Sequence, residues 1–93
     1  METKQYTISI TLIDNKINPC HCGHKIGDKW EFDYFTPPGI CSWAWNSIYP
    51  VALTFAAGGT FPWQKEPDVI SVCCPDVEIV NVFELRRTLK TPE

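Results

Sequence analysis

The spacing of the apolar residues changes along this chain from a period of two to a period of about 3.6 and back, which restricts the folds open to it. Over residues 5–13 and 29–34, apolar and polar residues alternate, and this predicts two β-strands with one buried face each. The side chains expected on those faces are Tyr6, Ile8, Ile10 and Leu12, then Trp30, Phe32 and Tyr34. Because the outer face of the second strand is charged, we expect one side of the sheet to meet water.

Residues 36–39, Thr-Pro-Pro-Gly, interrupt regular structure, and after them the apolar residues recur at the spacing of an α-helix. This spacing predicts one α-helix over about residues 40–57. The apolar stripe of this helix is Cys41, Ala44, Ile48, Val51, Ala52 and Phe55. Pro50 lies inside it, so a kink or a restart is expected there. The glycine pair at 58–59 is the expected end of the helix.

Two further strands are expected after the helix. Residues 69–73 form a short, nearly continuous apolar run, which indicates a central strand, and residues 79–87 form the last strand. Residues 88–93 are expected to be a frayed tail. The order β-β-α-β-β predicts a single α+β domain over residues 1–93, with a small four-stranded sheet, antiparallel or mixed, and the helix packed on one face.

Charge and hydropathy exclude several classes of partner. The formal net charge is −3, from 8 basic and 11 acidic residues, which argues against a general nucleic-acid binder. The basic residues Arg86, Arg87 and Lys90 are expected at a solvated strand end. We expect no membrane partner either, because no apolar stretch approaches the ~20 residues that span a bilayer. The amino terminus has no secretory signal pattern, which favours a cytoplasmic location.

Cysteine and histidine are concentrated between the first two predicted strands. In a reducing compartment, five cysteines are expected to be thiols or metal ligands rather than a disulfide framework. Cys20, Cys22 and His24 would point the same way in an extended segment, and Cys and His are the usual zinc ligands. Cys41 or Cys74 is expected as a fourth ligand. An iron–sulfur cluster is the less favoured cofactor, because the cysteine spacings match none of its familiar patterns.

Thiol catalysis is an alternative use of the same residues. Cys41, near the start of the predicted helix, would have a lowered pKa if it were exposed. His21 or His24 is available as a base, and Cys20 beside His21 is a second candidate nucleophile.

Core packing is the plainer alternative for some of these thiols. Free cysteine is among the most often buried residues, so Cys41 on the apolar stripe and Cys73 on the apolar strand are expected in the core. Cys74, which precedes a proline at a strand end, is expected to be accessible.

Short motifs extend over nearly the whole chain. They are Cys20-x-x-Gly23-His24-Lys25-x-Gly27-Asp28, Gly39-Ile40-Cys41-x-Trp43-Ala44, Tyr49-Pro50, Gly58-Gly59, Pro62-Trp63, Cys74-Pro75-Asp76 and Phe83-Glu84-x-Arg86-Arg87. In these motifs the chain resembles an uncharacterised, conserved family of prokaryotic proteins of similar length. The resemblance implies a small stand-alone cytoplasmic domain and brings no reaction. It places Cys20, Cys41 and Cys74 on the shared motifs, and Cys22 and Cys73 outside them.

The sequence therefore predicts a small cytoplasmic binding or accessory protein with a metal or thiol site at one end of its sheet. The expected site residues are Cys20, His24, Cys41 and Cys74, with Cys22 as an alternative ligand and zinc as the expected ion. One alternative is a thiol-dependent redox or transfer enzyme that uses Cys20 or Cys41. Another is an interaction module that binds a protein partner or a second copy through Trp43, Trp45 and Trp63.

Overall fold

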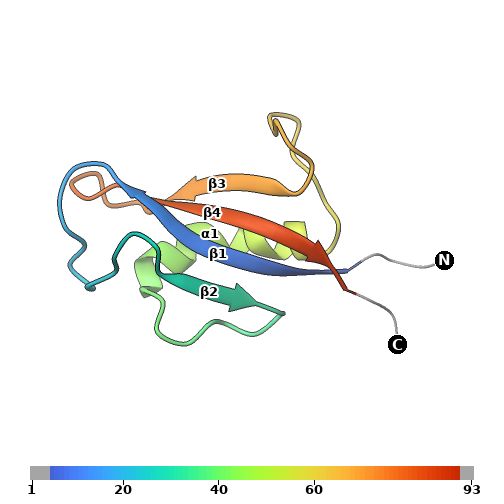
Figure 1. The fold of residues 1–93 in the computed structure, drawn as a ribbon, viewed down its shortest axis with the longest axis horizontal. Coiled ribbons are helices and arrows are strands. Elements are labelled where there is room, and N and C mark those ends of the chain that lie inside the picture. The colour runs from blue at the N-terminus through green and yellow to red at the C-terminus, as the bar shows by residue number, and fades with distance from the viewer. Residues whose placement is uncertain (1–4, 91–93) are drawn as a thin grey trace.

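The computed structural model describes residues 5–90, which form one helix and a four-stranded sheet. The elements are β1 (Tyr6–Asn15), β2 (Lys29–Phe32), α1 (Ser42–Ala56), β3 (Val69–Cys73) and β4 (Asn81–Leu89). Every strand pairing is antiparallel, in the order β2-β1-β4-β3, and α1 packs on one face of the sheet (Figure 1). The predicted α+β fold is confirmed, and its sheet is antiparallel rather than mixed.

The core lies between α1 and the sheet. Side chains of a strand point alternately to its two faces, so every second residue of β1 and β4 faces the helix. The most buried apolar side chains are Ile8, Ile10, Leu12, Phe32, Ala44, Ile48, Ala52, Phe55, Ala56, Phe83 and Leu85. The predicted meeting of the strand faces with the helix stripe is thus confirmed, except at Tyr34, which is exposed.

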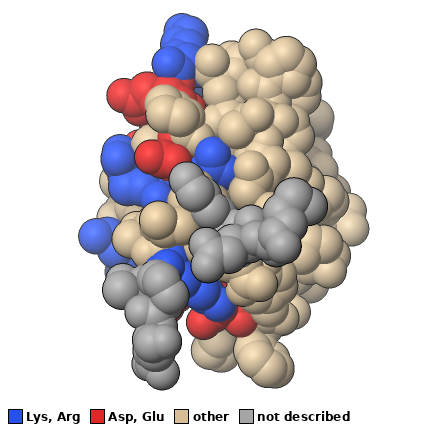
Figure 2. Space-filling view, turned by 90° about the vertical axis from the view of Figure 1, so that its right-hand side faces the viewer, with Lys and Arg blue, Asp and Glu red and all other residues tan. Residues whose placement is uncertain are grey.

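Charge is distributed unevenly around this core. The sequence of α1 contains no Asp, Glu, Lys or Arg. Figure 2 shows the charged side chains gathered on one side of the molecule, while the opposite side of that view is free of them among the described residues. One face of the sheet therefore meets water, as its polar alternate residues predict.

Two of the expected strands have different limits in the structure. β2 ends at Phe32, and Tyr34 lies beyond it with a φ of 64°, a left-handed conformation that no strand residue adopts. β4 begins at Asn81 instead of residue 79, because Val80 has a φ of 51° and belongs to the preceding turn. It continues through Leu89, so Thr88 and Leu89 belong to the sheet; residues 91–93 of the predicted tail lie outside the described residues.

The position of β3 was also predicted wrongly. It is an edge strand, paired with β4 alone, although its apolar run indicated a central one. The long strands β1 and β4 pair with each other from Tyr6↔Leu89 to Asn15↔Asn81, which leaves β3 the far side of β4. The helix continues as one element through Pro50, so of the kink or restart expected there, the restart does not occur.

Arg87 is buried, which corrects the prediction of a solvated strand end. Only 8 % of it is exposed, because strand alternation places it on the core face, two residues after Leu85. Its guanidinium donates hydrogen bonds to Asp68 Oδ1 at 3.0 Å and to the carbonyl oxygens of Phe55 (3.2 Å), Gly59 (2.7 Å) and Pro67 (2.9 Å). It also lies over the rings of Tyr6 and Phe55. One side chain thus joins β4 to the end of α1 and to the loop that follows.

Replacing this side chain should therefore destabilise the fold. We expect R87M to lower the free energy of unfolding by about 3 kcal/mol, because three carbonyl groups lose their donor. R86M is the matched control: Arg86 is exposed, so its loss should change stability by less than about 0.5 kcal/mol. Urea unfolding of the three proteins measures the difference. Equal midpoints for R87M and R86M would contradict the anchoring role.

Candidate functional site

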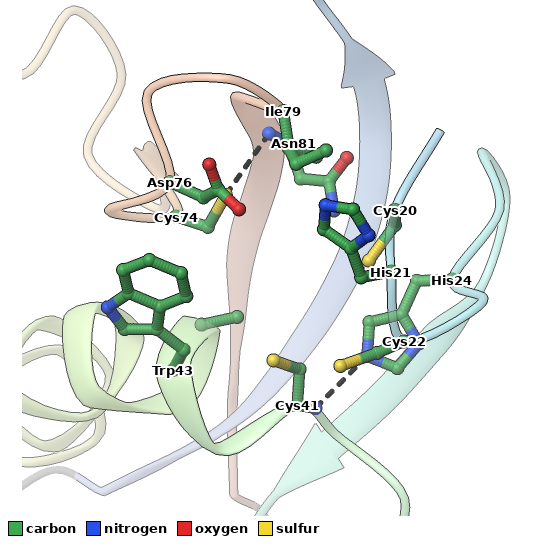
Figure 3. Close-up of a pocket in the computed structure, with 11 residues that line it drawn as sticks. Cys20, His21, Cys22, His24, Cys41, Trp43, Cys74, Asp76, Ile79 and Asn81 are labelled. Atoms are coloured by element: carbon green, nitrogen blue, oxygen red, sulfur yellow. Dashed lines mark hydrogen bonds between the residues drawn. The ribbon is translucent and has the colours of Figure 1, made fainter. Parts of the chain in front are cut away.

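A cavity of about 160 Å³ lies where three segments of the chain meet at one end of the sheet. These segments are the loop before β2, the start of α1, and the end of β3 with the turn into β4. The lining residues are Cys20, His21, Cys22, His24, Cys41, Trp43, Ala44, Cys74, Asp76, Ile79 and Asn81 (Figure 3). The structure thus brings Cys20, His24, Cys41 and Cys74 to one cavity, together with Cys22.

Cys73 does not belong to this group. It is exposed at the end of β3 and is absent from the described lining of the cavity. Its expected burial in the core is therefore wrong. Because strand neighbours point to opposite faces, the buried side of β3 takes Ile70 and Val72 instead.

The loop that carries Cys20, Cys22 and His24 is held against β1 by backbone hydrogen bonds. The Gly27 N–H donates to Leu12 O at 2.8 Å, and the Leu12 N–H donates to Asp28 O at 2.9 Å. Gly27 has a φ of 99°, a conformation that a residue with a Cβ rarely adopts. The Asp28 carboxylate accepts the Lys25 N–H, which helps to hold the turn between these two residues.

Cys74 is held by a reciprocal pair of contacts with Asn81. The Cys74 N–H donates to Asn81 O at 2.9 Å, and the Asn81 N–H donates to Cys74 Sγ at 3.3 Å. Cys74 is 8 % exposed, which corrects the expectation of an accessible thiol. Cys74 therefore lines the cavity with its sulfur already engaged by a backbone N–H.

His24 is committed to the backbone of Cys41. Its Nε2 accepts the Cys41 N–H at 3.0 Å, while its ring meets Trp30 edge-on with centroids 4.8 Å apart. A backbone N–H only donates, so Nε2 supplies the lone pair of this hydrogen bond. In this geometry His24 positions the start of α1 and does not present Nε2 to a metal ion or to a thiol.

Cys41 is the N-cap residue of α1. Partial burial is the largest single influence on the pKa of its thiol and raises it. Although Cys41 makes no close capping hydrogen bond, the N–H of Ala44, the S–H of Cys22 and the N–H of Trp43 all favour the charged sulfur. Together they outweigh burial and hold the pKa of Cys41 below its ordinary value. Cys41 is therefore the thiol most ready to ionise at this helix end.

Cys22 shows the opposite shift. The hydrogen bond from its S–H to Cys41 is the main cause that raises the pKa of Cys22 to about 11, followed by burial and by the charges on Cys41 and Cys20. Figure 3 shows the sulfur atoms of Cys22 and Cys41 close to each other at the wall of the cavity. At a pH between the lowered pKa of Cys41 and the raised pKa of Cys22, the pair therefore holds one proton, on Cys22, and one negative charge, on Cys41.

Metal coordination is not preformed here. Among residues 5–90, no three or more side chains of His, Cys, Asp or Glu are arranged to hold a metal ion. The predicted ligands share the cavity, but their donor atoms do not converge on one point. Zinc binding therefore stays a prediction.

The aromatic residues predicted for partner binding are placed differently from one another. Trp43 lines the cavity and is 54 % exposed, Trp63 is 69 % exposed in the loop after α1, and Trp45 is half-buried against Phe32. Trp45 is thus part of the core edge. Binding of a partner or a second copy stays a prediction.

Asp76, Ile79 and Asn81 complete the cavity and were not predicted as site residues. The Cys-Pro-Asp motif was a signal for Asp76, since it follows Cys74 by two residues. Nothing local marks Asn81, which reaches the site because its backbone pairs with Cys74 across the turn.

No family model, curated protein or solved structure matches the chain. The family resemblance seen in the motifs therefore stays a prediction. In the described part of the chain, no helix combines the length and the apolar character that a bilayer crossing requires.

The two opposite pKa shifts predict the order in which these thiols react. Under limiting iodoacetamide, alkylation of Cys41 should rise at a pH below the ordinary value of 9.0, whereas Cys22 should react only near pH 11. C22A removes a donor to the Cys41 thiolate, so it should move the Cys41 profile to higher pH. C73A, which removes an exposed thiol outside the cavity, should leave that profile unchanged. Peptide mass spectrometry reads each site, and alkylation of Cys22 at lower pH than Cys41 would contradict the assignment.

Proposed function

We propose that this protein is a thiol-active protein in which Cys41 and Cys22 form a dithiol–disulfide pair, with Cys41 as the nucleophile. The observation that carries the proposal is that Cys22 and Cys41 line the same cavity at the amino terminus of α1, with their sulfur atoms near each other (Figure 3). A helix amino terminus stabilises a thiolate, and the thiolate is the nucleophile in disulfide exchange. This is the redox alternative predicted from the sequence, with Cys22 as the partner thiol.

The chemistry balances with a disulfide as the second reactant. The Cys41 thiolate attacks one sulfur of a substrate R–S–S–R; a Cys41–S–S–R bond forms, and R–S⁻ leaves. The Cys22 thiol gives its proton to R–S⁻, and the resulting Cys22 thiolate attacks the Cys41 sulfur. A Cys22–Cys41 disulfide forms and a second R–S⁻ leaves, which takes a proton from water. The substrate gains two electrons, and the protein dithiol loses them.

The raised pKa of Cys22 suits this second step. Its main cause is the hydrogen bond to the Cys41 thiolate, and the charge of that thiolate adds to it. Once Cys41 is part of a mixed disulfide, it carries no charge and both contributions disappear. The pKa of Cys22 then falls toward its ordinary value, so Cys22 becomes a nucleophile only after Cys41 has reacted.

Mild oxidation tests the pair directly. We expect diamide to convert the native protein to a form with a Cys22–Cys41 disulfide, found as one linked peptide by non-reducing mass spectrometry. C73A should form the same linkage, whereas C22A and C41A should not. A protein in which Cys22 and Cys41 stay reduced, or in which Cys41 pairs with Cys20 while Cys22 is present, would refute the dithiol assignment.

Zinc binding is the second candidate, and one observation favours it. Cys20, Cys22, Cys41 and Cys74 all line this one cavity, although they come from three separate segments of the chain. Because His24 is engaged through Nε2, the four thiolates of these cysteines are the better donor set. Tetrahedral sites made of four cysteine thiolates are typical of structural zinc. The same donors suit an iron–sulfur cluster, which nothing else in the site supports.

Elemental analysis of protein purified without added metal separates the two candidates. The dithiol proposal expects metal-free protein whose Cys22–Cys41 pair oxidises at once with diamide. A zinc site expects about one zinc per chain, and it blocks that disulfide until a chelator removes the metal. A metal-free protein whose melting temperature is unchanged by added zinc would eliminate the zinc candidate.

The cellular location follows from the same chemistry in this proposal. A reducing cytoplasm keeps Cys22 and Cys41 as a dithiol ready to reduce a substrate. We accordingly propose a cytoplasmic reductant or accessory thiol protein.

A further inference from the structure

We propose that the cavity selects small, uncharged, largely apolar organic disulfides, with a substituent about the size of a benzene ring, and disfavours anionic ones. This inference rests on the proposed thiol function and names its substrate class. It is carried by the volume of the cavity, the chemistry of its walls and the position of Cys41 on one of them.

The volume limits the substituent. A cavity of about 160 Å³ compares with the engineered cavities of about 150 Å³ that bind benzene. Sites for drug-sized ligands are larger, at roughly 300–1,000 Å³. One small organic group of a disulfide therefore fits inside, and a peptide or a nucleotide-bearing thiol does not.

The side chains that line the cavity determine the polarity of the substituent that it binds. Most of the surface lining the cavity is apolar and is contributed by side chains such as Trp43, Ala44 and Ile79. Burial of apolar surface against such walls favours binding in proportion to its area. A substituent of hydrocarbon character therefore gains more than a hydrated polar one.

The charges of the cavity lining disfavour anionic substituents. The described lining contains neither Lys nor Arg, and its carboxylate is Asp76. The reactive form of Cys41 adds a further negative charge. A carboxylate or sulfonate entering the cavity would lose water without meeting a cation, which is unfavourable.

Methanethiosulfonates test the selectivity with defined probes. The Cys41 thiolate attacks R–S–SO2CH3, a Cys41–S–S–R bond forms, and methanesulfinate leaves. The probes are benzyl methanethiosulfonate, which is neutral, and 2-sulfonatoethyl methanethiosulfonate, which is anionic. We expect the ratio of the neutral to the anionic rate to be on the order of tenfold higher at Cys41 than at Cys73, the exposed thiol of the same molecule.

A pair of tryptophan variants provides the control. W43A removes a cavity wall and should bring the ratio at Cys41 toward that at Cys73. W63A removes an equally large exposed side chain outside the cavity and should leave it unchanged. Equal ratios at Cys41 and Cys73, or a preference of Cys41 for the anionic probe, would overturn the substrate class. The diamide experiment reports on the dithiol separately, so linkage of Cys22 to Cys41 without selectivity would refute this inference alone.

Discussion

The position of α1 over the sheet is the constraint on which the rest of the structure depends. Its inner face, around Ile48 and Phe55, is fully buried, and each such side chain contributes about 1.5–3 kcal/mol. Apolar burial is non-directional, so it does not by itself set where the helix begins and ends. Polar contacts do this: His24 accepts the Cys41 N–H at the start, and Arg87 donates to the Phe55 carbonyl at the end.

Holding the helix at both ends determines where its amino terminus lies. Cys41 therefore occupies a defined place on the cavity wall, where backbone N–H groups and the Cys22 thiol favour its charged form. A loop-borne thiol without that support would have an ordinary pKa. The chemistry proposed for the site is thus a consequence of helix placement as much as of cysteine content.

The site joins segments that are distant in the sequence. Cys22 brings the loop before β2 to the cavity beside Cys41 of α1, and Cys74 reaches the cavity through its backbone pairing with Asn81. Motif spacing identified cysteine and histidine as the residue types of the site, because they are concentrated in one stretch of the sequence. A thiol near the start of a helix is also expected to have a lowered pKa. Motif spacing could not identify Cys22 as the partner of Cys41, since contacts between loops depend on how the chain closes. For the same reason, motif spacing suggested His24 as a metal ligand, whereas its Nε2 accepts a hydrogen bond from the backbone N–H of Cys41.

Local periodicity in the sequence by itself determined the five elements and the faces that form the core, because side-chain direction repeats every two residues in a strand and every 3.6 in a helix. Tertiary structure alone decided that β3 lies at the edge, that Arg87 meets carbonyl acceptors from the end of α1 and the following loop, and that Cys74 is buried. These outcomes depend on which strands pair with each other and on which backbone carbonyl groups lack a hydrogen-bond donor. Such partners lie tens of residues apart, so no local pattern encodes them.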